Sequence, residues 1–350
     1  MSDSEAIVRR KDEHLDIALA QQARRDWENP FDAYAFDHCA LPEIAFDQVD
    51  LRARFLTWSL RLPFIISSMT GGPSRGSAIN AHLAEAAEHL GVILAVGSQR
   101  VALEGAGAAG IDEALRRRMP TAPLLGNLGA AQLVLGYGVD EARRAIEMIG
   151  ADGLIIHLNP LQEAVQPGGD GDWRGVLSAI EMICARIDAP VLVKEVGAGL
   201  SASVARRLHD AGVAALDVAG RGGTSWAGIE ADRTEDGPAR TAAAPFRDWG
   251  ISTPRALQEV REALPGIPLI GSGGVRHGLD AAKALRLGAD LVGQAGSVLQ
   301  AGMTSAEAVI NHFEIMARQL RICCFATGSG DLTALRQARL VCHALPVHDV

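Results

Sequence analysis

Short apolar runs alternate with helical patterns along most of the chain after residue 60. The runs are apolar on both faces and often β-branched, which is typical of strands buried in a parallel sheet. We expect strands at 63–68, 92–96, 123–126, 153–158, 190–195, 215–218, 268–271 and 291–294. Helical patterns separate them and include 78–90, 140–149, 173–187, 201–211 and 279–287.

Eight strands in this rhythm indicate a closed barrel rather than an open doubly wound sheet. We therefore predict an α/β fold, a (β/α)8 TIM barrel formed by residues 61–350, with residues 1–60 as an N-terminal extension. The extension is polar and is broken by Asn29-Pro30 and Leu41-Pro42. Residues 232–248, polar and rich in alanine and threonine, predict an insertion or mobile loop. We find no convincing repeat longer than the βα unit.

Composition is that of a soluble enzyme and excludes some partners. The net charge of −9 and the aromatic content of 4% argue against nucleic-acid binding. The five cysteines show no metal or disulfide spacing, which indicates reduced thiols in a cytoplasmic protein. The N-terminus has no apolar signal region, and no apolar run approaches the length of a membrane span, so no membrane partner is expected.

Two late strands run directly into glycine and other small residues. They are Ile267-Pro-Leu-Ile-Gly-Ser-Gly-Gly-Val-Arg276 and Ala289-Asp-Leu-Val-Gly-Gln-Ala-Gly-Ser297. Glycine lets backbone N–H groups approach an anion, and a following helix adds its positive N-terminus. In TIM barrels the loops after strands 7 and 8 frequently bind phosphate. The pattern favours a phosphorylated ligand, with two ordinary tight turns as the alternative.

Polar groups recur at nearly every predicted strand end, where barrel enzymes carry their chemistry. The segments are Ser67-Ser-Met-Thr-Gly-Gly72, Gly97-Ser-Gln-Arg100, Gly126-Asn127, His157-Leu-Asn159 with Gln162-Glu163, Lys194-Glu195, and Ala219-Gly-Arg-Gly-Gly-Thr-Ser-Trp226. Each alone is compatible with a loop cap. Together they predict an active site at this end of the barrel.

Nine motifs, in order, carry a resemblance to a known family. They are Arg10-Lys11-x-x-His14, Met69-Thr-Gly-Gly72, Gly97-Ser-Gln-Arg100, Gly126-Asn-Leu-Gly129, His157-Leu-Asn-x-Leu-Gln-Glu163, Val193-Lys-Glu-Val196, Gly222-Gly-Thr-Ser-Trp226, Asp248-Trp-Gly250 and Gly271-Ser-Gly-Gly-Val-Arg276. Over most of its length the chain resembles the FMN-dependent type 2 isopentenyl-diphosphate isomerases. It departs from the family pattern at Ala219, where serine is common, and at Arg221, in a stretch of normally small residues.

The resemblance implies interconversion of isopentenyl and dimethylallyl diphosphate without net redox change, with FMN, Mg²⁺, and NADPH to keep the flavin reduced. An unactivated alkene is a poor base, so its protonation needs a strong, well-placed acid and a dry site. In this family the N5 edge of the reduced flavin is given that role. No strand end here offers an obvious carboxylate pair instead. The family also suggests a homo-oligomer, a tetramer or octamer.

The flavin contacts implied by the resemblance are polar side chains at strand ends and the late glycine loops. Lys194 would bond the N1–C2=O edge, although a lysine at this place is also compatible with a Schiff-base nucleophile. The other implied FMN contacts are Ser68, Met69, Thr70, Ser98, Asn127 and Thr224 for the ring and ribityl chain, and Gly273, Gly274, Arg276, Ala295 and Gly296 for the phosphate, mainly through backbone N–H groups.

The resemblance implies a separate set for the substrate diphosphate, which needs cations. That set is Arg10, Lys11, His14, Ser98, Gln99, Arg100, His157, Asn159 and Gln162. Glu163 is the expected Mg²⁺ ligand, because Mg²⁺ is satisfied by one carboxylate plus waters and phosphate oxygens. Gln162, His157 and Trp226 are the expected catalytic residues, with Trp226 as an apolar wall facing positive charge.

Two other functions stay open at this point. An FMN-dependent α-hydroxy acid oxidase shares the barrel and the phosphate loop, but it needs a late histidine base followed closely by arginine. Here His277 follows the phosphate loop instead of preceding it. The other alternative is a sugar-phosphate-binding barrel without flavin.

Overall fold

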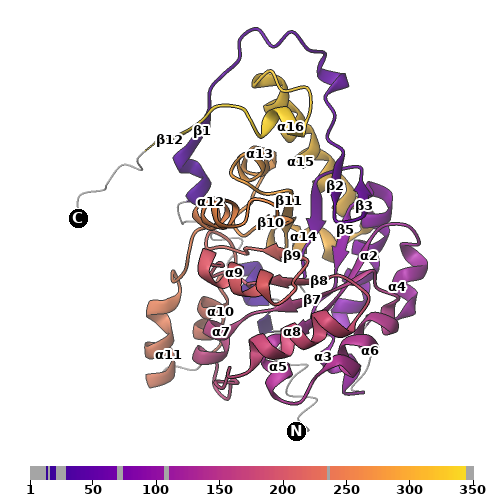
Figure 1. Cartoon of the computed structure of the whole chain (residues 1–350), viewed down its shortest axis with the longest axis vertical. Coiled ribbons are helices and arrows are strands. Elements are labelled where there is room, and N and C mark those ends of the chain that lie inside the picture. The colour runs from indigo at the N-terminus through magenta and orange to yellow at the C-terminus, as the bar shows by residue number, and fades with distance from the viewer. Residues whose placement is uncertain are drawn as a thin grey trace.

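The chain closes into a parallel β-barrel with helices around it, seen in a computed structural model that describes residues 13–14, 16–20, 29–68, 74–105, 110–234 and 237–343 (Figure 1). The strands are β4 (Phe64–Ile66), β5 (Ile93–Ala95), β6 (Leu124–Gly129), β7 (Gly153–His157), β8 (Val191–Lys194), β9 (Ala215–Asp217), β10 (Leu269–Ser272) and β11 (Leu291–Gln294). Each pairs in parallel with its neighbours, and β11 returns to β4. The predicted TIM barrel and all eight strand positions are confirmed.

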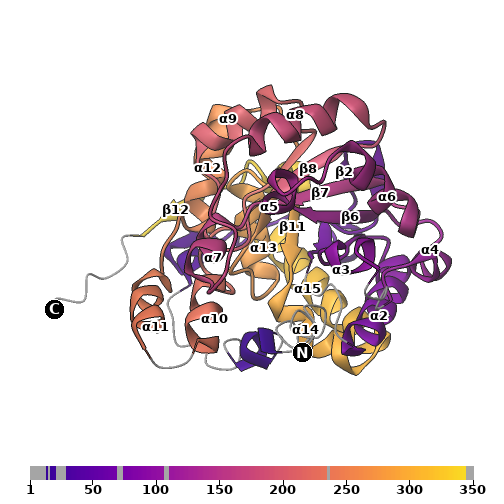
Figure 2. The same cartoon turned by 90° about the horizontal axis from the view of Figure 1, so that it is seen from below.

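Helices surround the barrel (Figure 2). The longer ones are α2 (Ser74–Leu90), α6 (Val139–Ile149), α8 (Val176–Arg186), α9 (Ala202–Asp210), α12 (Thr253–Ala263), α13 (Gly278–Arg286), α14 (Gly296–Thr304) and α15 (Ala306–Ala326). Shorter ones are α3 (Arg100–Leu103), α4 (Glu113–Arg118), α5 (Ala130–Val134), α7 (Pro160–Val165) and α16 (Leu332–Leu335). No helix in the described ranges is both long and apolar enough to cross a membrane.

The loop predicted at residues 232–248 is instead largely helical. Helix α10 (Trp226–Arg233) is followed by α11 (Pro238–Ala243) and η3 (Ala244–Phe246). Proline at the first position and a run of alanines favour a helix, so the small residues stabilise structure here. Arg247 donates to Asp232 at 2.6 Å and 3.1 Å, which ties the two ends of the segment together.

Much of the N-terminal extension is ordered and covers the barrel. Strand β1 (Tyr34–Phe36), after η1 (Pro30–Ala33), pairs antiparallel with β12 (Leu340–Cys342). After η2 (Phe46–Gln48), β2 (Ala53–Phe55) and β3 (Trp58–Leu60) form a hairpin. Phe55 and Leu60 are buried with interior residues at the N-terminal ends of barrel strands, including Ile93 and Leu291. The hairpin therefore closes the end of the barrel opposite the predicted site.

Two halves of the barrel share a repeated arginine–aspartate clamp. Arg116 donates to the carbonyls of Met119, Ala122 and Gly150 and to Asp152, whose carboxylate accepts the N–H of Leu124. Arg261 does the same with Pro265, Ile267, Gly288 and Asp290, whose carboxylate accepts the N–H of Leu269. The units β6–β7 and β10–β11, which lie on opposite sides of the barrel, therefore share the same clamp.

Candidate active site

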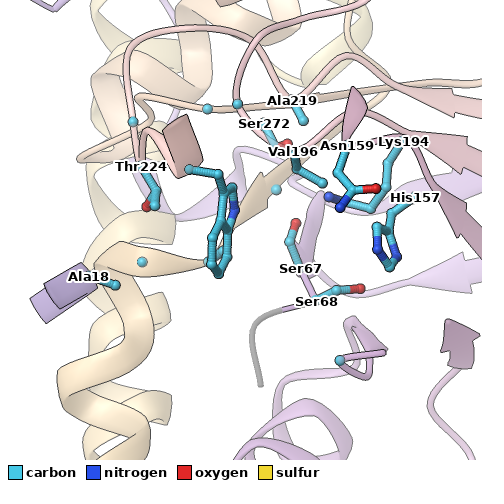
Figure 3. Close-up of a pocket in the computed structure, with 18 of the residues that line it drawn as sticks. Ala18, Ser67, Ser68, His157, Asn159, Lys194, Val196, Ala219, Thr224 and Ser272 are labelled. Carbon is cyan, nitrogen blue, oxygen red and sulfur yellow. The ribbon is translucent and has the colours of Figure 1, made fainter. Parts of the chain in front are cut away.

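A cavity of about 300 Å³ opens at the C-terminal ends of the barrel strands (Figure 3). Every strand contributes to its wall through its last residues or the loop that follows. The predicted residues that line it are His14, Ser68, Ser98, Arg100, Asn127, His157, Asn159, Gln162, Glu163, Lys194, Thr224, Trp226, Gly273, Gly274, Arg276, Ala295 and Gly296. Arg10, Lys11, Met69 and Thr70 lie outside the described residues.

Gln99 is the one described member of the predicted set that does not line this cavity. It is fully buried, and its Nε2 donates to the carbonyl of Ala145 at 2.8 Å. Its Oε1 accepts the backbone N–H of Asn127 at 2.8 Å. The structure therefore corrects the expected substrate contact: Gln99 holds Asn127 in place from behind the wall.

Asn127 in turn fixes the ring of His157. Its Nδ2 donates to the carbonyl of Val96 at 3.0 Å, so its Oδ1 is left as an acceptor. That Oδ1 lies 2.8 Å from Nδ1 of His157, which must then carry the proton. Gly129 leaves room for the other nitrogen, because a Cβ there would lie 3.0 Å from Nε2. His157 thus has a fixed tautomer and orientation.

Lys194 ends β8 as a buried ammonium beside two buried carboxyls. Its Nζ donates to the carbonyl of Glu195 at 2.6 Å. Burial lowers the pKa of Lys194, and the charges of Asp217 and Glu195 oppose that shift. Asp217 is its register partner on β9 and accepts from Ser272 at 2.7 Å. Burial raises the pKa of Asp217, so this end of the barrel is strongly desolvated around Lys194.

The loop after β8 is wrapped around the carboxylate of Glu195. Its Oε2 accepts the N–H groups of four successive residues, 196–199, at 2.5–3.0 Å. Burial raises the pKa of Glu195, while these backbone hydrogen bonds lower it. Val196 and Gly197 of this loop line the cavity. Glu195 therefore shapes one wall without facing the cavity itself.

Glu230 on α10 is a site residue that sequence reasoning missed. It is fully buried, forms an ion pair with His14 Nε2 at 2.9 Å, and accepts hydrogen bonds from Gln162 Nε2 at 3.0 Å and Arg233 Nε at 2.9 Å. Burial raises its pKa, but His14, Gln162 and Arg233 outweigh that and lower it to about 2. Its spacing of four from Trp226 on one helix was the available signal, because such residues share a face.

Glu163 lies at the cavity wall with both carboxylate oxygens hydrogen-bonded. Oε1 accepts from Asn159 Nδ2 at 2.9 Å, and Oε2 accepts the N–H of Asp170 at 2.9 Å. No group of three or more His, Cys, Asp or Glu side chains in the described ranges forms a ready metal site. A cation at Glu163 would therefore need oxygens from water and a ligand, as Mg²⁺ accepts.

The glycine loops after β9 and β10 pack backbone against backbone. Gly273 and Gly274 have φ values of 96° and 77°, which favour glycine. A Cβ on Gly274 would lie 2.7 Å from the carbonyl oxygen of Gly222. Helix α14 begins at Gly296 on the same side, and first-turn N–H groups of a helix have no intrahelical acceptor. This cradle fits a phosphate group.

The predicted FMN contact Arg276 and the two positions that depart from the family pattern, Ala219 and Arg221, have partners within the protein. The backbone N–H of Arg276 donates to Asp280 at 3.0 Å, and its guanidinium pairs with Asp32 at 2.6 Å. Ala219, at the cavity wall, has a φ of 37°, a left-handed conformation that its hydrogen bonds to Asp217 and Gly199 maintain. Arg221 is exposed, and its backbone bridges to Ser252.

Comparison with known proteins decides the family. Isopentenyl-diphosphate delta-isomerases of Stutzerimonas stutzeri and Xanthobacter autotrophicus are 62% and 59% identical to this chain, over 96% and 97% of it and 98% of each relative. The isomerase of Nostoc sp. is 44% identical over 96% of both. The FMN-dependent dehydrogenase family model matches residues 169–342. The chain belongs to the FMN-dependent, type 2 isopentenyl-diphosphate delta-isomerase family.

Solved structures confirm the fold of this isomerase family member. A mandelate oxidase with benzoyl-formic acid superposes with a TM-score of 0.61 at 19% identity, covering 91% of this chain and 89% of the oxidase. A second, with a C4a-OH-FMN adduct, gives 0.61 at 18% identity over 98% and 100%. At such identity the likeness concerns the barrel alone.

Proposed function

We propose that this enzyme interconverts isopentenyl diphosphate and dimethylallyl diphosphate, using reduced FMN and Mg²⁺. The proposal is supported mainly by a single cavity whose two sides differ in chemistry. A glycine cradle and a helix N-terminus form one side, while His14, Arg100 and His157 bring nitrogen groups to the other. Such a cavity suits two anionic groups, a flavin phosphate and a substrate diphosphate.

The described residues fit FMN. Gly273, Gly274 and Gly296 line the cavity with backbone, and a Cβ at Gly274 would collide with the backbone of Gly222 that packs against it. In the described part of the chain the buried Oγ atoms of Ser67 and Ser68 have no hydrogen-bond partner. Lys194 would place its ammonium against the ring edge and favour the anionic reduced flavin. Bound FMN, reduced by NADPH, would supply an electron-rich ring and an acid–base edge to this cavity.

The substrate diphosphate would lie against the polar wall formed by β6, β7 and the helical segment at His14. Arg100 adds a guanidinium, and His157 would donate through Nε2–H as the doubly protonated imidazolium. Asn159 also lines this wall, and its buried Oδ1, an acceptor without a partner in the described ranges, would face the metal or a water and not the anion. Arg10, Lys11 and Ser98 belong to the same proposed set. Glu163 would hold Mg²⁺ that neutralises part of the diphosphate charge.

The protein's own groups would orient the alkene and keep water out. Gln162 is held by Glu230, so its amide has a fixed direction at the cavity wall. Trp226 lies against His14, with ring centroids 5.3 Å apart, and offers an aromatic face to developing positive charge. A proton moved onto an unactivated alkene needs this dry, cation-tolerant wall.

An oxidase is the second candidate, and the geometry of His277 disfavours it. Its Nδ1 accepts the N–H of Asp280 as the cap of α13, and among the described residues it lies outside the cavity wall. It is therefore badly placed as a base. The contribution of residues 1–60 to the diphosphate site, the homo-oligomer and the cytoplasmic location stay predictions from the sequence and the family.

The test is an anaerobic assay with isopentenyl diphosphate, FMN, dithionite or NADPH, and Mg²⁺. The proposal expects dimethylallyl diphosphate to form only with reduced flavin, without stoichiometric NADPH use. Turnover with oxidised flavin and oxygen consumption in a parallel aerobic assay would favour an oxidase. A protein that binds no flavin, as judged by its visible absorbance, would exclude both.

A further inference from the structure

The segment 29–32 of the N-terminal extension lies directly against the glycine cradle. Asn29 is almost fully buried, and its Nδ2 donates to the carbonyl of Gly274 at 2.9 Å and to Asp280 Oδ2 at 3.1 Å. Its Oδ1 accepts the N–H of Phe31 at 3.1 Å. One amide therefore joins positions 245 residues apart in the sequence.

Three further contacts join the segment 29–32 to the two glycine loops and to α13. Lys283 Nζ donates to the carbonyl of Phe31 at 2.9 Å. Arg276 pairs with Asp32 at 2.6 Å. Pro30 packs behind Gly222, where a Cβ would lie 3.0 Å from the proline Cδ. The extension is thus built into the cradle at both of its glycine loops.

These contacts hold the backbone of the cradle in place. Gly274 is left-handed, with a φ of 77°, and its carbonyl is held by Asn29, which lies at the edge of the same cavity. Asp280, the second acceptor of Asn29, also accepts the N–H of Arg276. Asn29 and Asp280 therefore fix the loop on both sides of Val275. A phosphate cradle works only when its N–H groups point inward and its carbonyls point away.

We propose that Asn29 is a positioning residue for the FMN phosphate, acting through the carbonyl of Gly274 and through Asp280. The inference rests on the proposed FMN site. The position requires an amide, because Gly274 O and Asp280 Oδ2 are both acceptors while Phe31 N–H is a donor. Aspartate has the same shape but cannot donate when ionised, and it would face two acceptors.

The experiment measures flavin binding to apoprotein, with FMN and riboflavin as the two probes. Riboflavin lacks the phosphate, so the ratio of its Kd to that of FMN reports the phosphate contact alone. Asn29→Ala should weaken FMN binding about tenfold, the effect of one buried hydrogen bond to a charged or backbone acceptor. Asn29→Asp should weaken it further. Riboflavin affinity should stay within about twofold in both variants, because the ring contacts are unchanged.

Matched controls separate this role from a general loss of structure. Asn311→Ala makes the same chemical change on the exposed face of α15 and should leave both affinities unchanged. If the Asn29 variants bind neither flavin, Asp32→Asn decides, because Asp32 is exposed and its change should lower the FMN preference alone. The fluorescence of free flavin, quenched on binding, is a suitable signal.

Each outcome of the flavin-binding experiment either supports or refutes one of the two proposals. A wild-type chain that binds no FMN refutes the proposed function itself. A wild type that prefers FMN, with Asn29 variants that keep the full preference, overturns only the role of Asn29. An equal loss of FMN and riboflavin in Asp32→Asn would also overturn it, since the effect would then not concern the phosphate. Selective loss of FMN affinity supports it.

Discussion

Replacement of Glu230 by glutamine tests the buried cluster that joins α10 to the cavity. The carboxylate has a pKa of about 2 against an ordinary 4.5, because His14, Gln162 and Arg233 together outweigh the burial that raises it. One pKa unit corresponds to about 1.36 kcal/mol, so the ionised form stabilises the folded chain by about 3 kcal/mol. Glu230→Gln should therefore remove a large part of a typical stability of about 5–15 kcal/mol.

The lowered pKa of Glu230 determines how the stability difference between wild type and Glu230→Gln changes with pH. A carboxyl whose folded pKa is lowered stabilises the fold fully above its unfolded value and progressively less as pH falls toward the folded value. The wild type should be more stable than Glu230→Gln above pH 4.5, and the difference should shrink between pH 4.5 and about 2. Urea denaturation followed by tryptophan fluorescence at several pH values measures it.

A matched control and an activity measurement sharpen the result. Glu259→Gln changes an exposed ion pair with Arg255 on α12 and should alter stability by less than about 1 kcal/mol. Glu230→Gln should also raise the KM for isopentenyl diphosphate, because it loosens His14 and Gln162. Equal urea midpoints for wild type and Glu230→Gln at pH 7, or a difference undiminished at acid pH, would refute the reasoning.

Three other variants test the proposed site. Lys194→Ala should still fold but lose most copurifying flavin, because a charged hydrogen bond of about 1.5–3 kcal/mol is removed. A variant with full flavin content and wild-type turnover would contradict this. Deletion of residues 1–12 should raise the substrate KM strongly and leave FMN affinity intact, whereas loss of flavin would make the segment structural. Glu163→Gln should lose most activity, on the order of a hundredfold, and most Mg²⁺ dependence yet stay yellow. An unchanged Mg²⁺ titration would contradict that metal role.

The barrel strands were predictable because each one is marked by its own run of apolar residues. Each strand is short and buried on both faces, so apolar residues appear consecutively and mark the strand without knowledge of its neighbours. Residues 291–294 illustrate this, since prediction and structure coincide. The segment after Arg233 was predicted wrongly because alanine and threonine in a polar context suit a loop as well as a short helix. Contacts such as Arg247 with Asp232 decide between them.

The supports behind the cavity were not predictable, because each depends on a distant partner. Gln99 was assigned to the substrate by its place in a motif, yet its side chain turns away to Ala145. In the sequence Asn29 indicated only a break before Pro30, yet its side chain contacts a loop 245 residues away. Glu230 had no strand-end position to draw attention to it. Such roles become visible only when the closed barrel brings these segments together.

The two proposed anion sites differ in how far the sequence alone indicates them. Pro123-Leu-Leu-Gly-Asn-Leu-Gly129 and Pro268-Leu-Ile-Gly-Ser-Gly-Gly274 occupy equivalent places in the two half-barrels, so the cavity has equivalent strand ends on opposite sides. At Gly273 and Gly274 the cradle is backbone, and only glycine tolerates its conformation, which leaves a local mark in the sequence. Across the cavity, Asn127 and His157 form a wall of side chains held by a chain of hydrogen bonds. A side-chain site of this kind carries no local mark in the sequence, so the proposal of an anion site there rests on the resemblance to the family.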